Sequence, residues 1–346
     1  MMDPADLLAA TANGKFLEGF RFPLLAGLVA LLVSWLLTPW VRKLAFAKGA
    51  VDDPKRDDRR IHKEPLPRWG GIAIYIGFVV SSLIVLPFAY PFNPIPLYLV
   101  GILAIGGLLV VIGALDDLYQ YPAKIQLIAL LAAGVGVQFL FDNVGRVQMG
   151  TIGIPFSGGY YLDIKAWYLA VPLTAIYIFV VTKTMDTIDG VDGLAAGIAA
   201  ISATTLAIIA ATVGQPRVAM LAAAIGGASL GFLRHNYNPA KIIMGTGGAY
   251  ILGFTLACLS IVGALKVMAA IALIVPLLAF GVPIFDAFFV ITKRVMSGVP
   301  ITQADKRHVH HTLLGKGLSQ RQTVLVLYAV TAALCGVLLM LVIKRG

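Results

Sequence analysis

The stretch K-T-M-D-T-I-D-G-V-D-G-L-A-A-G, residues 183–197, places three carboxylates at intervals of three residues between two apolar runs. Carboxylates beside or inside membrane-length segments are costly, and they usually mark a substrate or ion site. A helix start capped by aspartate would account for one of them but not for three. On a helix, this spacing would place Asp189 and Asp192 on one face, with Asp186 one turn before them. We therefore expect a site at this junction.

Composition indicates a membrane protein. Of the 346 residues, 59% are hydrophobic and 13% are charged, and the mean hydropathy is +0.88, whereas a soluble domain is about a quarter charged. Runs rich in Ala, Leu, Ile and Gly favour helices over barrel strands. The sequence predicts a single all-α polytopic domain over 1–346. About ten runs can span a bilayer core: 22–41, 70–90, 96–115, 123–141, 165–182, 190–213, 217–233, 247–265, 268–292 and 323–343.

The distribution of basic residues predicts the topology. With both termini outside, 19 of the 27 Lys and Arg residues fall on one side of the membrane, which the positive-inside rule makes cytoplasmic. All five histidines fall on that side too. We expect a multi-pass protein of a bacterial-type plasma membrane, with a short outside tail and a cytoplasm-facing site. The tail is 1–21, and the inside loops are about 42–69, 116–124, 183–189, 234–246 and 293–322.

The net charge of +10 does not point to nucleic acid. No nucleic-acid-binding motif accompanies it, and topology together with anionic lipid headgroups accounts for the basic excess. Cys258 and Cys335 sit alone inside apolar runs, which favours core packing over a disulfide or a metal pair. The outside loop 142–165 contains β-branched residues and a Gly-Gly pair, which predict a small hairpin.

Two inside loops carry charges suited to phosphate chemistry. In the first, His62, Lys63 and Arg68 precede a predicted membrane entry at Gly70, where cations could meet a diphosphate or a lipid phosphate; a solvated loop is the alternative. In the second, the adjacent carboxylates Asp116 and Asp117 end a span. Two like charges this close repel each other unless a cation lies between them or one is protonated.

Three further stretches face the same side. Asn236 and Asn238 carry amides that suit nucleobase edges or sugar hydroxyls, and the glycine-rich segment 245–248 could open a helix toward an anion or serve as a tight turn. Asp286, among aromatic residues, suggests a functional carboxylate or a buried pair with Lys293 or Arg294.

A histidine cluster follows in the last inside loop. H-V-H-H lacks the spacing of a zinc peptidase motif, and no cysteine lies near it in the sequence. We interpret it as a cluster for phosphate binding or proton transfer, with exposed loop histidines as the alternative. Its histidines are His308, His310 and His311.

Taken together, these stretches resemble the polyprenyl-phosphate N-acetylhexosamine-1-phosphate transferase family. The motifs occur in order between residues 53 and 327: D-P…R-R-I-H-K…P-R-W-G-G at 53–71, D-D-L-Y at 116–119, D-G-V-D-G-L-A at 189–195, N-Y-N-P-A-K-I-I-M-G at 236–245 and D-K-R-H-V-H-H at 305–311. The histidine motif looks more like the branch that starts O-antigen, teichoic acid or related glycans, with undecaprenyl phosphate and UDP-GlcNAc as substrates, than the phospho-MurNAc-pentapeptide branch.

The resemblance implies ten helices and an Mg²⁺-dependent transfer, with Mn²⁺ as a substitute. N-acetylhexosamine-1-phosphate would pass from a UDP-sugar to a polyprenyl phosphate, with release of UMP; a homodimer is left open. Asp116 or Asp117 would deprotonate the lipid phosphate or act as nucleophile. Asp189 and Asp192 would organise metal and nucleotide, Asn236 would meet the uridine, and the three histidines, with His62, Lys63 and Arg68, would hold phosphates. The predicted metal ligands are Asp117, Asp186, Asp192 and Asp286.

Four positions depart from the family pattern. The usual N-x-x-N is replaced by Lys183 and Asp186, and M-G-D-x-G-S by M-G-T-G-G-A, so that Thr246 stands where the family has a magnesium-binding aspartate and Ala249 replaces the serine. A neutral hydroxyl is a much poorer Mg²⁺ ligand than a carboxylate. Asp186 could compensate, or the protein could be an impaired homologue. A flippase for a lipid-linked anionic sugar is the alternative from another class, and it would place polar residues near the bilayer midplane.

Overall fold

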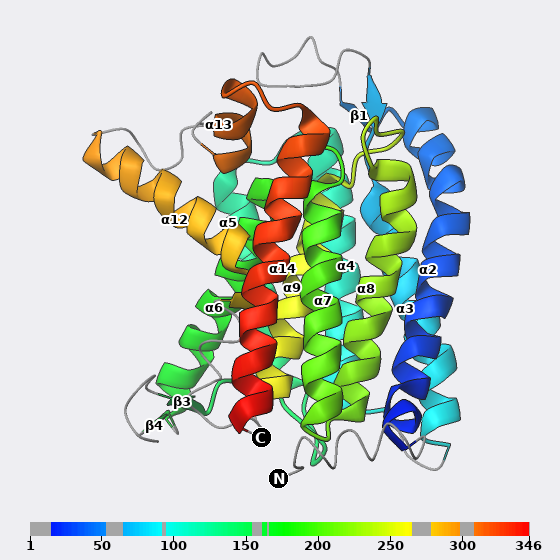
Figure 1. Ribbon diagram of the computed structural model, residues 1–346, viewed down its shortest axis with the longest axis vertical. Coiled ribbons are helices and arrows are strands. Elements are labelled where there is room, and N and C mark those ends of the chain that lie inside the picture. Colours follow the sequence, from blue (N-terminus) through cyan, green and yellow to red (C-terminus); the bar gives the residue numbers. More distant parts are fainter. Residues whose placement is uncertain are drawn as a thin grey trace.

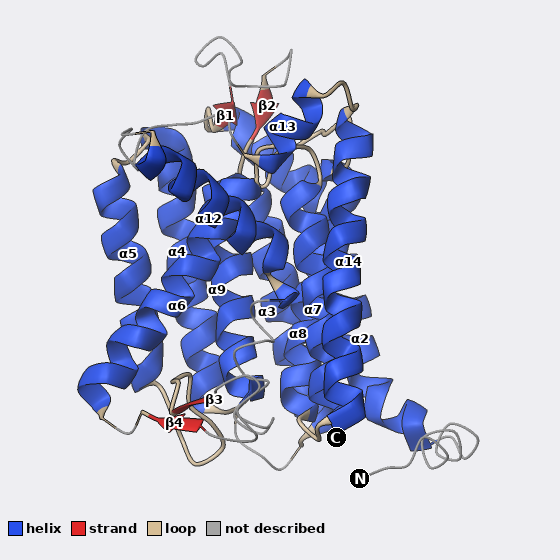
Figure 2. Ribbon diagram, turned by 60° about the vertical axis from the view of Figure 1, so that its left-hand side comes forward, coloured by secondary structure: helices blue, strands red, loops and turns tan. Residues whose placement is uncertain are grey.

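The computed structural model describes residues 15–52, 65–91, 95–153, 161–164, 166–264, 278–297 and 308–345. Helices dominate it, as Figure 2 shows. The long helices are α2 (Lys15–Ala47), α3 (Gly70–Ala89), α4 (Leu97–Tyr119), α6 (Trp167–Ile188), α7 (Leu194–Thr212), α8 (Pro216–Asn236), α9 (Gly245–Ala264) and α14 (Gln320–Arg345). The shorter ones are α5 (Ala123–Gly136), which continues as the 3₁₀ turn η2 (Val137–Phe139), α12 (Gly281–Met296) and α13 (Val309–Gly315).

The predicted all-α polytopic membrane protein is confirmed. Among the described residues, eight helices are long and apolar enough to cross a membrane, and the segment Ala123–Phe139 is a shorter apolar helix. The expected span 268–292 begins outside the described residues, and its described part belongs to α12, which runs obliquely away from the bundle in Figure 1. Which membrane face each end of the bundle meets stays a prediction.

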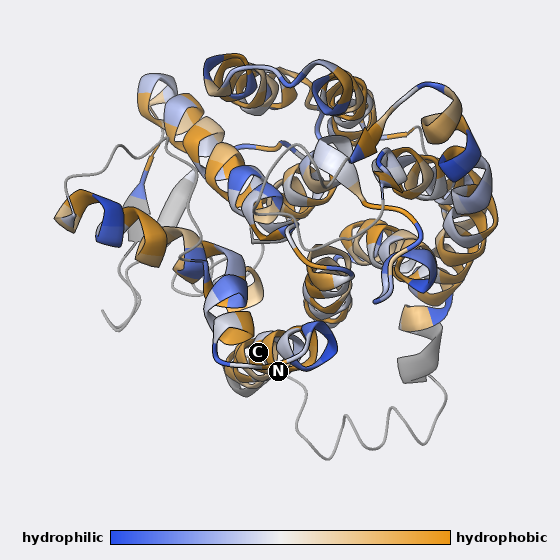
Figure 3. Ribbon diagram, turned by 90° about the horizontal axis from the view of Figure 1, so that it is seen from above, coloured by the Kyte–Doolittle hydropathy of each residue, from blue (hydrophilic) through white to orange (hydrophobic). Residues whose placement is uncertain are grey.

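Helix α9 lies at the centre of the arrangement. It packs against α4, α6 and α3, whereas α2, α3 and α8 form one side of the bundle and α7, α8 and α14 another (Figure 1). Hydrophobic residues cover the outward faces of the helices as well (Figure 3), which is expected where lipid rather than water surrounds them. The core includes Phe78, Phe232, Tyr250 and Phe254, all fully buried.

Glycine contacts fix the start of α9 against its neighbours. A Cβ atom added to Gly71 of α3 would lie 2.2 Å from the Gly248 nitrogen, and one added to Gly113 of α4 would lie 2.3 Å from the Gly247 Cα atom. Backbones can approach this closely only where no side chain intervenes, a common packing mode between membrane helices. The start of α3, the last part of α4 and the start of α9 are therefore held together at backbone distance, and the candidate site is built there.

Two short hairpins lie at opposite ends of the bundle (Figure 2). The predicted hairpin in the loop 142–165 is confirmed: β3 (Thr151–Gly153) pairs antiparallel with β4 (Tyr161–Asp163). At the other end, β1 (Val51–Asp52) pairs with β2 (Leu66–Pro67). This second hairpin lies inside the segment 42–69, which we expected to be loop throughout.

Two expected loop boundaries are wrong. Helix α2 extends to Ala47, six residues into the first expected loop, and α6 extends to Ile188, so that Lys183 and Asp186 are helical. Residues that favour helix continue past the end of each predicted span. Each helix ends shortly before a glycine, which is a common helix terminator. In both cases charged residues sit on the last turns of a helix.

The placement of Asp189 and Asp192 on one helical face is also wrong. Asp189 follows the last residue of α6, and the backbone then turns before α7 begins at Leu194. Gly193 has φ +79°, in the left-handed region that glycine occupies without strain, and it ends the turn. The three carboxylates therefore lie on a helix end and a tight turn rather than on one continuous helix.

Candidate functional site

The site is built around two adjacent carboxylates at the end of α4. Asp116 and Asp117 are both buried, and the hydroxyl group of Thr246, on the first turn of α9, lies 3.0 Å from Asp116 Oδ2 and 3.2 Å from Asp117 Oδ1. The Thr246 backbone N–H also donates to Asp117 Oδ1, at 3.2 Å. Asp117 Oδ2 is buried and has no hydrogen-bond partner among the described residues. Asp117 Oδ2 is thus the oxygen atom of this carboxylate pair that can accept a contact from a ligand.

Arg68 supplies a positive charge to this pair. Its Nε atom lies 3.4 Å from Asp117 Oδ1 and 3.8 Å from Asp52 Oδ1 of the β1–β2 hairpin. Burial alone would lower the pKa of Arg68, but the carboxylates of Asp117 and Asp52 outweigh it and raise the pKa above its usual value. The guanidinium group therefore stays charged beside Asp117, as the predicted phosphate-binding role requires.

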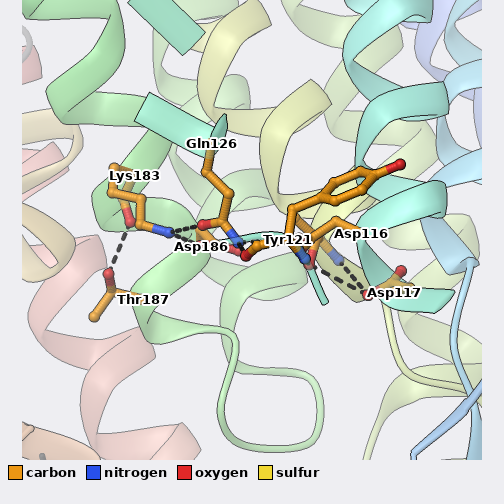
Figure 4. A network of polar contacts seen from close by, with 8 residues as sticks. Asp116, Asp117, Tyr121, Gln126, Lys183, Asp186 and Thr187 are labelled. Atoms are coloured by element: carbon orange, nitrogen blue, oxygen red, sulfur yellow. Dashed lines mark hydrogen bonds and ion pairs between the residues drawn. The ribbon is translucent and has the colours of Figure 1, made fainter. Parts of the chain in front are cut away.

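A second cation enters from α6. Lys183 Nζ lies 2.6 Å from Asp186 Oδ2 and donates to Gln126 Oε1 of α5 at 2.9 Å. The Gln126 amide in turn donates to Asp116 Oδ1 at 3.1 Å, and the Tyr121 backbone N–H donates to the same oxygen at 2.9 Å. Figure 4 shows these side chains as one continuous polar network that joins α4, α5 and α6.

The turn between α6 and α7 adds the remaining predicted carboxylates. Burial and the neighbouring Asp186 raise the pKa of Asp189 well above its usual range, while Arg68 acts in the opposite direction. Asp192 is buried, and its Oδ2 accepts hydrogen bonds from the Asn238 amide at 2.9 Å and the Ala240 N–H at 3.0 Å. Asp192 thus anchors the segment between α8 and α9 to this turn.

Asn236 is buried between the α6–α7 turn and the segment that joins α8 to α9. Its amide oxygen accepts the Gly193 N–H at 3.0 Å, and its amide nitrogen donates to the Ile242 carbonyl at 2.9 Å. The side chain therefore joins the α6–α7 turn to the start of α9. Its predicted role at a uridine stays a prediction, and in this arrangement both ends of the amide already have backbone partners.

The histidine cluster lies against the α6–α7 turn. His308 Nδ1 lies 2.8 Å from Asp286 Oδ2, and the Val309 N–H donates to Asp286 Oδ1 at 2.7 Å. Asp286 thus pairs with the cluster; a pair with Lys293 or Arg294 was the alternative to a functional carboxylate at this position. His310 is buried, its ring stacks on His308, and its Nε2 atom would lie 2.9 Å from a Cβ atom on Gly190. Gly190 therefore leaves the space that lets His310 reach the turn.

Burial strongly changes the pKa of His310. It lowers the pKa of His310 to about 3, with His311 acting in the same direction and Asp286 in the opposite one. The His310 ring is accordingly neutral at physiological pH, and its Nδ1 atom has no hydrogen-bond partner among the described residues. Of the three predicted phosphate-binding histidines, His310 is thus suited to packing and hydrogen bonding rather than to charge neutralisation.

The donor set of the site fits a divalent ion only in part. Within the described residues, no group of three or more His, Cys, Asp or Glu side chains lies close enough to share a metal ion. Among the four predicted ligands, Asp186 is paired with Lys183, and Asp286 with His308. Asp117 keeps one buried, unpartnered oxygen. Mg²⁺ is usually held by one or two carboxylates, phosphate oxygens and water, so Asp117 together with a phosphorylated ligand could hold it.

The structure brings most of the predicted residues into one region at one end of the bundle. His62 and Lys63 lie outside the described residues. Sequence reasoning missed three participants as site residues: Gln126, Lys183 and the hydrogen-bonding role of Thr246. The departures from the family motifs at positions 183 and 246 could have indicated Lys183 and Thr246 as site residues. Gln126 gave no signal, because its contacts with Asp116 of α4 and Lys183 of α6 depend on how α5 packs between these helices.

The chain is similar in sequence to known proteins of one family. The model of glycosyl transferase family 4 matches residues 99–264. The chain is 35% identical over 305 residues to a probable undecaprenyl-phosphate N-acetylglucosaminyl 1-phosphate transferase of Bacillus subtilis, covering 88% of this chain and 81% of the relative. It is 33% identical to the decaprenyl-phosphate N-acetylglucosaminephosphotransferase of Mycolicibacterium smegmatis, covering 94% and 84%.

A more distant relative extends the comparison. The undecaprenyl-phosphate alpha-N-acetylglucosaminyl 1-phosphate transferase of Escherichia coli K12 is 27% identical, with 88% of this chain and 79% of the relative covered. The similarity to all three relatives thus extends over most of the chain. With the motifs gathered at one end of the helix bundle, the chain belongs to glycosyl transferase family 4, in agreement with its resemblance to the polyprenyl-phosphate N-acetylhexosamine-1-phosphate transferases.

Proposed function

We propose that this protein transfers N-acetylglucosamine-1-phosphate from UDP-GlcNAc to a polyprenyl phosphate in a bacterial plasma membrane and releases UMP on the cytoplasmic side. The names of the relatives support the sugar phosphate and the lipid acceptor. The observation that carries the proposal is the buried carboxylate pair, in which Asp117 keeps one unpartnered oxygen beside the Arg68 guanidinium. A group of this kind can accept a proton or attack a phosphorus atom.

The proposed reaction is a displacement at phosphorus. An oxygen of the polyprenyl phosphate forms a bond to the phosphorus atom that carries the sugar, and the bond from that phosphorus to the bridging oxygen breaks, so that UMP leaves with the electron pair. Asp117 takes the proton of the lipid phosphate; in a two-step route its carboxylate would attack first. Two anions must meet, so fixed positive charge nearby lowers the barrier. Arg68 supplies such a charge.

Mg²⁺ is part of the proposal, with Mn²⁺ as a substitute. Asp117 would hold it through Oδ2, together with phosphate oxygens of the donor and water; with Oδ2 on the metal, Asp116 would take the proton of the lipid phosphate in place of Asp117. When bound, such an ion polarises the phosphoryl oxygens and neutralises developing charge. Asp192, also predicted as a ligand, instead anchors the Asn238–Ala240 segment through Oδ2. The flippase alternative requires polar groups near the midplane, whereas the polar network described here lies at the ends of α4 and α6.

An assay with purified protein tests the proposal. The protein in lipid nanodiscs, with undecaprenyl phosphate, UDP-GlcNAc and Mg²⁺, is expected to release UMP and to form a lipid-linked GlcNAc diphosphate. Replacing UDP-GlcNAc by UDP-GalNAc tests the choice of sugar. Asp117→Asn should lower the rate by roughly 100-fold or more, the usual range for removing an acid–base group. Asp163→Asn, in the β3–β4 hairpin at the other end of the bundle, is the matched control.

The outcomes separate the alternatives. UMP release by the wild-type protein that survives Asp163→Asn and is lost in Asp117→Asn supports both the reaction and the role of Asp117. UMP release that Asp117→Asn leaves unchanged would remove the role of Asp117. A folded wild-type protein that releases no UMP from either donor would contradict the proposed function and favour an impaired homologue.

A further inference from the structure

Lys183 occupies a position that neither the proposed reaction nor the predicted ligand set uses. It lies in the last two turns of α6, and its ammonium group contacts Asp186 Oδ2 at 2.6 Å and Gln126 Oε1 at 2.9 Å. Through Gln126 the network continues to Asp116, and through Thr246 to Asp117. Figure 4 shows Lys183 at one end of this network and the carboxylate pair at the other.

The network already contains its own positive charge. Arg68 lies beside Asp117 and Lys183 beside Asp186, so a cation faces the carboxylates from each of two directions. Between them, Thr246 contributes a neutral hydroxyl that hydrogen-bonds to both Asp116 and Asp117. A hydroxyl donor reduces the repulsion between two carboxylates without adding charge. Asp116, Asp117 and Asp186 are thus compensated in part before any metal ion binds.

The ammonium group is also within reach of a ligand. The Lys183 side chain keeps 37% of its surface exposed, against 19% for Asp186, so the lysine is the more accessible member of the pair. A lysine ammonium has three donors, and here two of the contacts are taken by Asp186 and Gln126. Among the contacts of the described residues, one donor therefore remains for an anion.

We infer that Lys183 is a resident cation of the site, which contacts a phosphate of the donor and supplies part of the positive charge that a divalent ion would otherwise provide. This inference deepens the proposed function and rests on it for the identity of the donor. Two consequences follow from Coulomb's law. The ammonium group repels a divalent cation, so it weakens metal binding. It attracts the nucleotide diphosphate, so it allows the nucleotide to bind when no metal is present.

Two binding measurements without turnover test this inference. Mn²⁺ binding to the purified protein is followed by the electron paramagnetic resonance signal of the free ion. UDP binding in excess EDTA is followed by calorimetry. For Lys183→Met we expect roughly tenfold tighter Mn²⁺ binding and roughly tenfold weaker UDP binding, each corresponding to about 1.4 kcal/mol. Lys183→Arg keeps the charge and should stay close to wild type. Lys48→Met, at the exposed end of α2, is the matched control and should change neither.

A second variant separates a charge effect from loss of structure, and it also serves if Lys183→Met does not fold. Asp186→Asn removes the partner of the lysine and leaves the ammonium in place. It should weaken Mn²⁺ binding and strengthen UDP binding in EDTA, opposite in sign to Lys183→Met. If the two residues formed only a structural ion pair, breaking it from either side would move both affinities in the same direction.

The inference and the proposed function fail in different ways. Unchanged Mn²⁺ and UDP affinities in Lys183→Met, or shifts of the same sign in Lys183→Met and Asp186→Asn, would overturn the role of Lys183 even if the wild-type protein releases UMP. A wild-type protein that binds no UDP in EDTA would overturn it as well. Conversely, opposite shifts in the two variants together with no UMP release would support a resident cation and contradict the transfer reaction.

Discussion

Asp286 holds His308 in place: Oδ2 lies 2.8 Å from His308 Nδ1, while Oδ1 accepts the Val309 N–H at 2.7 Å. One buried carboxylate therefore both orients the first histidine of the H-V-H-H motif and binds the first turn of α13. Because it joins α12 to α13, the histidine cluster depends on the position of α12. This contact gives a first prediction.

Asp286→Asn should uncouple the histidine cluster from α12. The amide keeps the shape of the side chain but loses the charge, and hydrogen bonds to a charged group are worth about 1.5–3 kcal/mol. We expect a lower thermal midpoint and a fall in UMP release of about tenfold or more. Fluorescence-detected unfolding in detergent and the nanodisc assay measure the two effects. Asp163→Asn is again the control, and wild-type values for Asp286→Asn in both assays would contradict the coupling.

His310 should make stability fall at mildly acidic pH. Its folded-state pKa of about 3 lies below the unfolded value of about 6.5, so the folded state binds fewer protons than the unfolded state at intermediate pH. The neutral ring therefore contributes its full stabilisation above pH 6.5, and this contribution decreases as the pH falls toward 3. At pH 5 the loss relative to pH 8 amounts to about 2 kcal/mol. Thermal midpoints of wild type and His310→Gln between pH 8 and pH 5 test this. The wild-type midpoint should decrease more steeply, whereas parallel curves would mean that His310 titrates normally.

Thr246→Asp should make the site dependent on a cation. The new carboxylate would face Asp116 and Asp117 at the distances where the hydroxyl now donates, 3.0 and 3.2 Å, and the hydrogen bonds would become repulsion. We expect a lower thermal midpoint than wild type in EDTA and a larger increase on addition of Mg²⁺. Thr246→Asn, which adds bulk without charge, is the control. An equal Mg²⁺ response in Thr246→Asp and wild type would mean that this carboxylate does not reach the metal.

Gly113→Ala tests the close contact between α4 and α9. The added Cβ atom would lie 2.3 Å from the Gly247 Cα atom, so the helices must separate, and overpacking of this kind typically costs about 1–3 kcal/mol. We expect a clearly lower thermal midpoint and reduced UMP release, because Asp116 and Asp117 lie one turn further along α4. Gly336→Ala in α14, where an added Cβ meets nothing within 4 Å, should be neutral. Equal midpoints for the two variants would refute the close packing.

The helices and the grouping of the motifs could be predicted from the sequence. Long apolar runs define spans because membrane thickness sets their length, and the positive-inside rule placed all the motif-bearing loops on one side. Asp116, Asp117, Asp189 and Arg68 were therefore expected on the same side, and in the structure both Arg68 and Asp117 lie close enough to Asp189 to influence its pKa.

Details that depend on tertiary packing could not be predicted. The positive φ of Gly193 belongs to a turn that ends where α7 begins at Leu194, whereas the sequence predicted a span from residue 190, and the i, i+3 spacing alone does not distinguish a turn from a helix start. The partner of Asp286 was sought among nearby basic residues, whereas His308 lies 22 positions away. Gln126 looked like an ordinary residue of an apolar helix, and only its contacts with Asp116 of α4 and Lys183 of α6 give its amide a role.

The contact between Thr246 and the carboxylates of α4 has a consequence for biosynthesis. The two partners are separated by about 130 positions along the chain. Asp116 and Asp117 therefore emerge from the ribosome and reach the membrane long before the hydroxyl that will bridge them exists. Until α9 inserts, the nascent protein carries an adjacent pair of negative charges without the hydroxyl that bridges them, so assembly of the centre is a late event in synthesis.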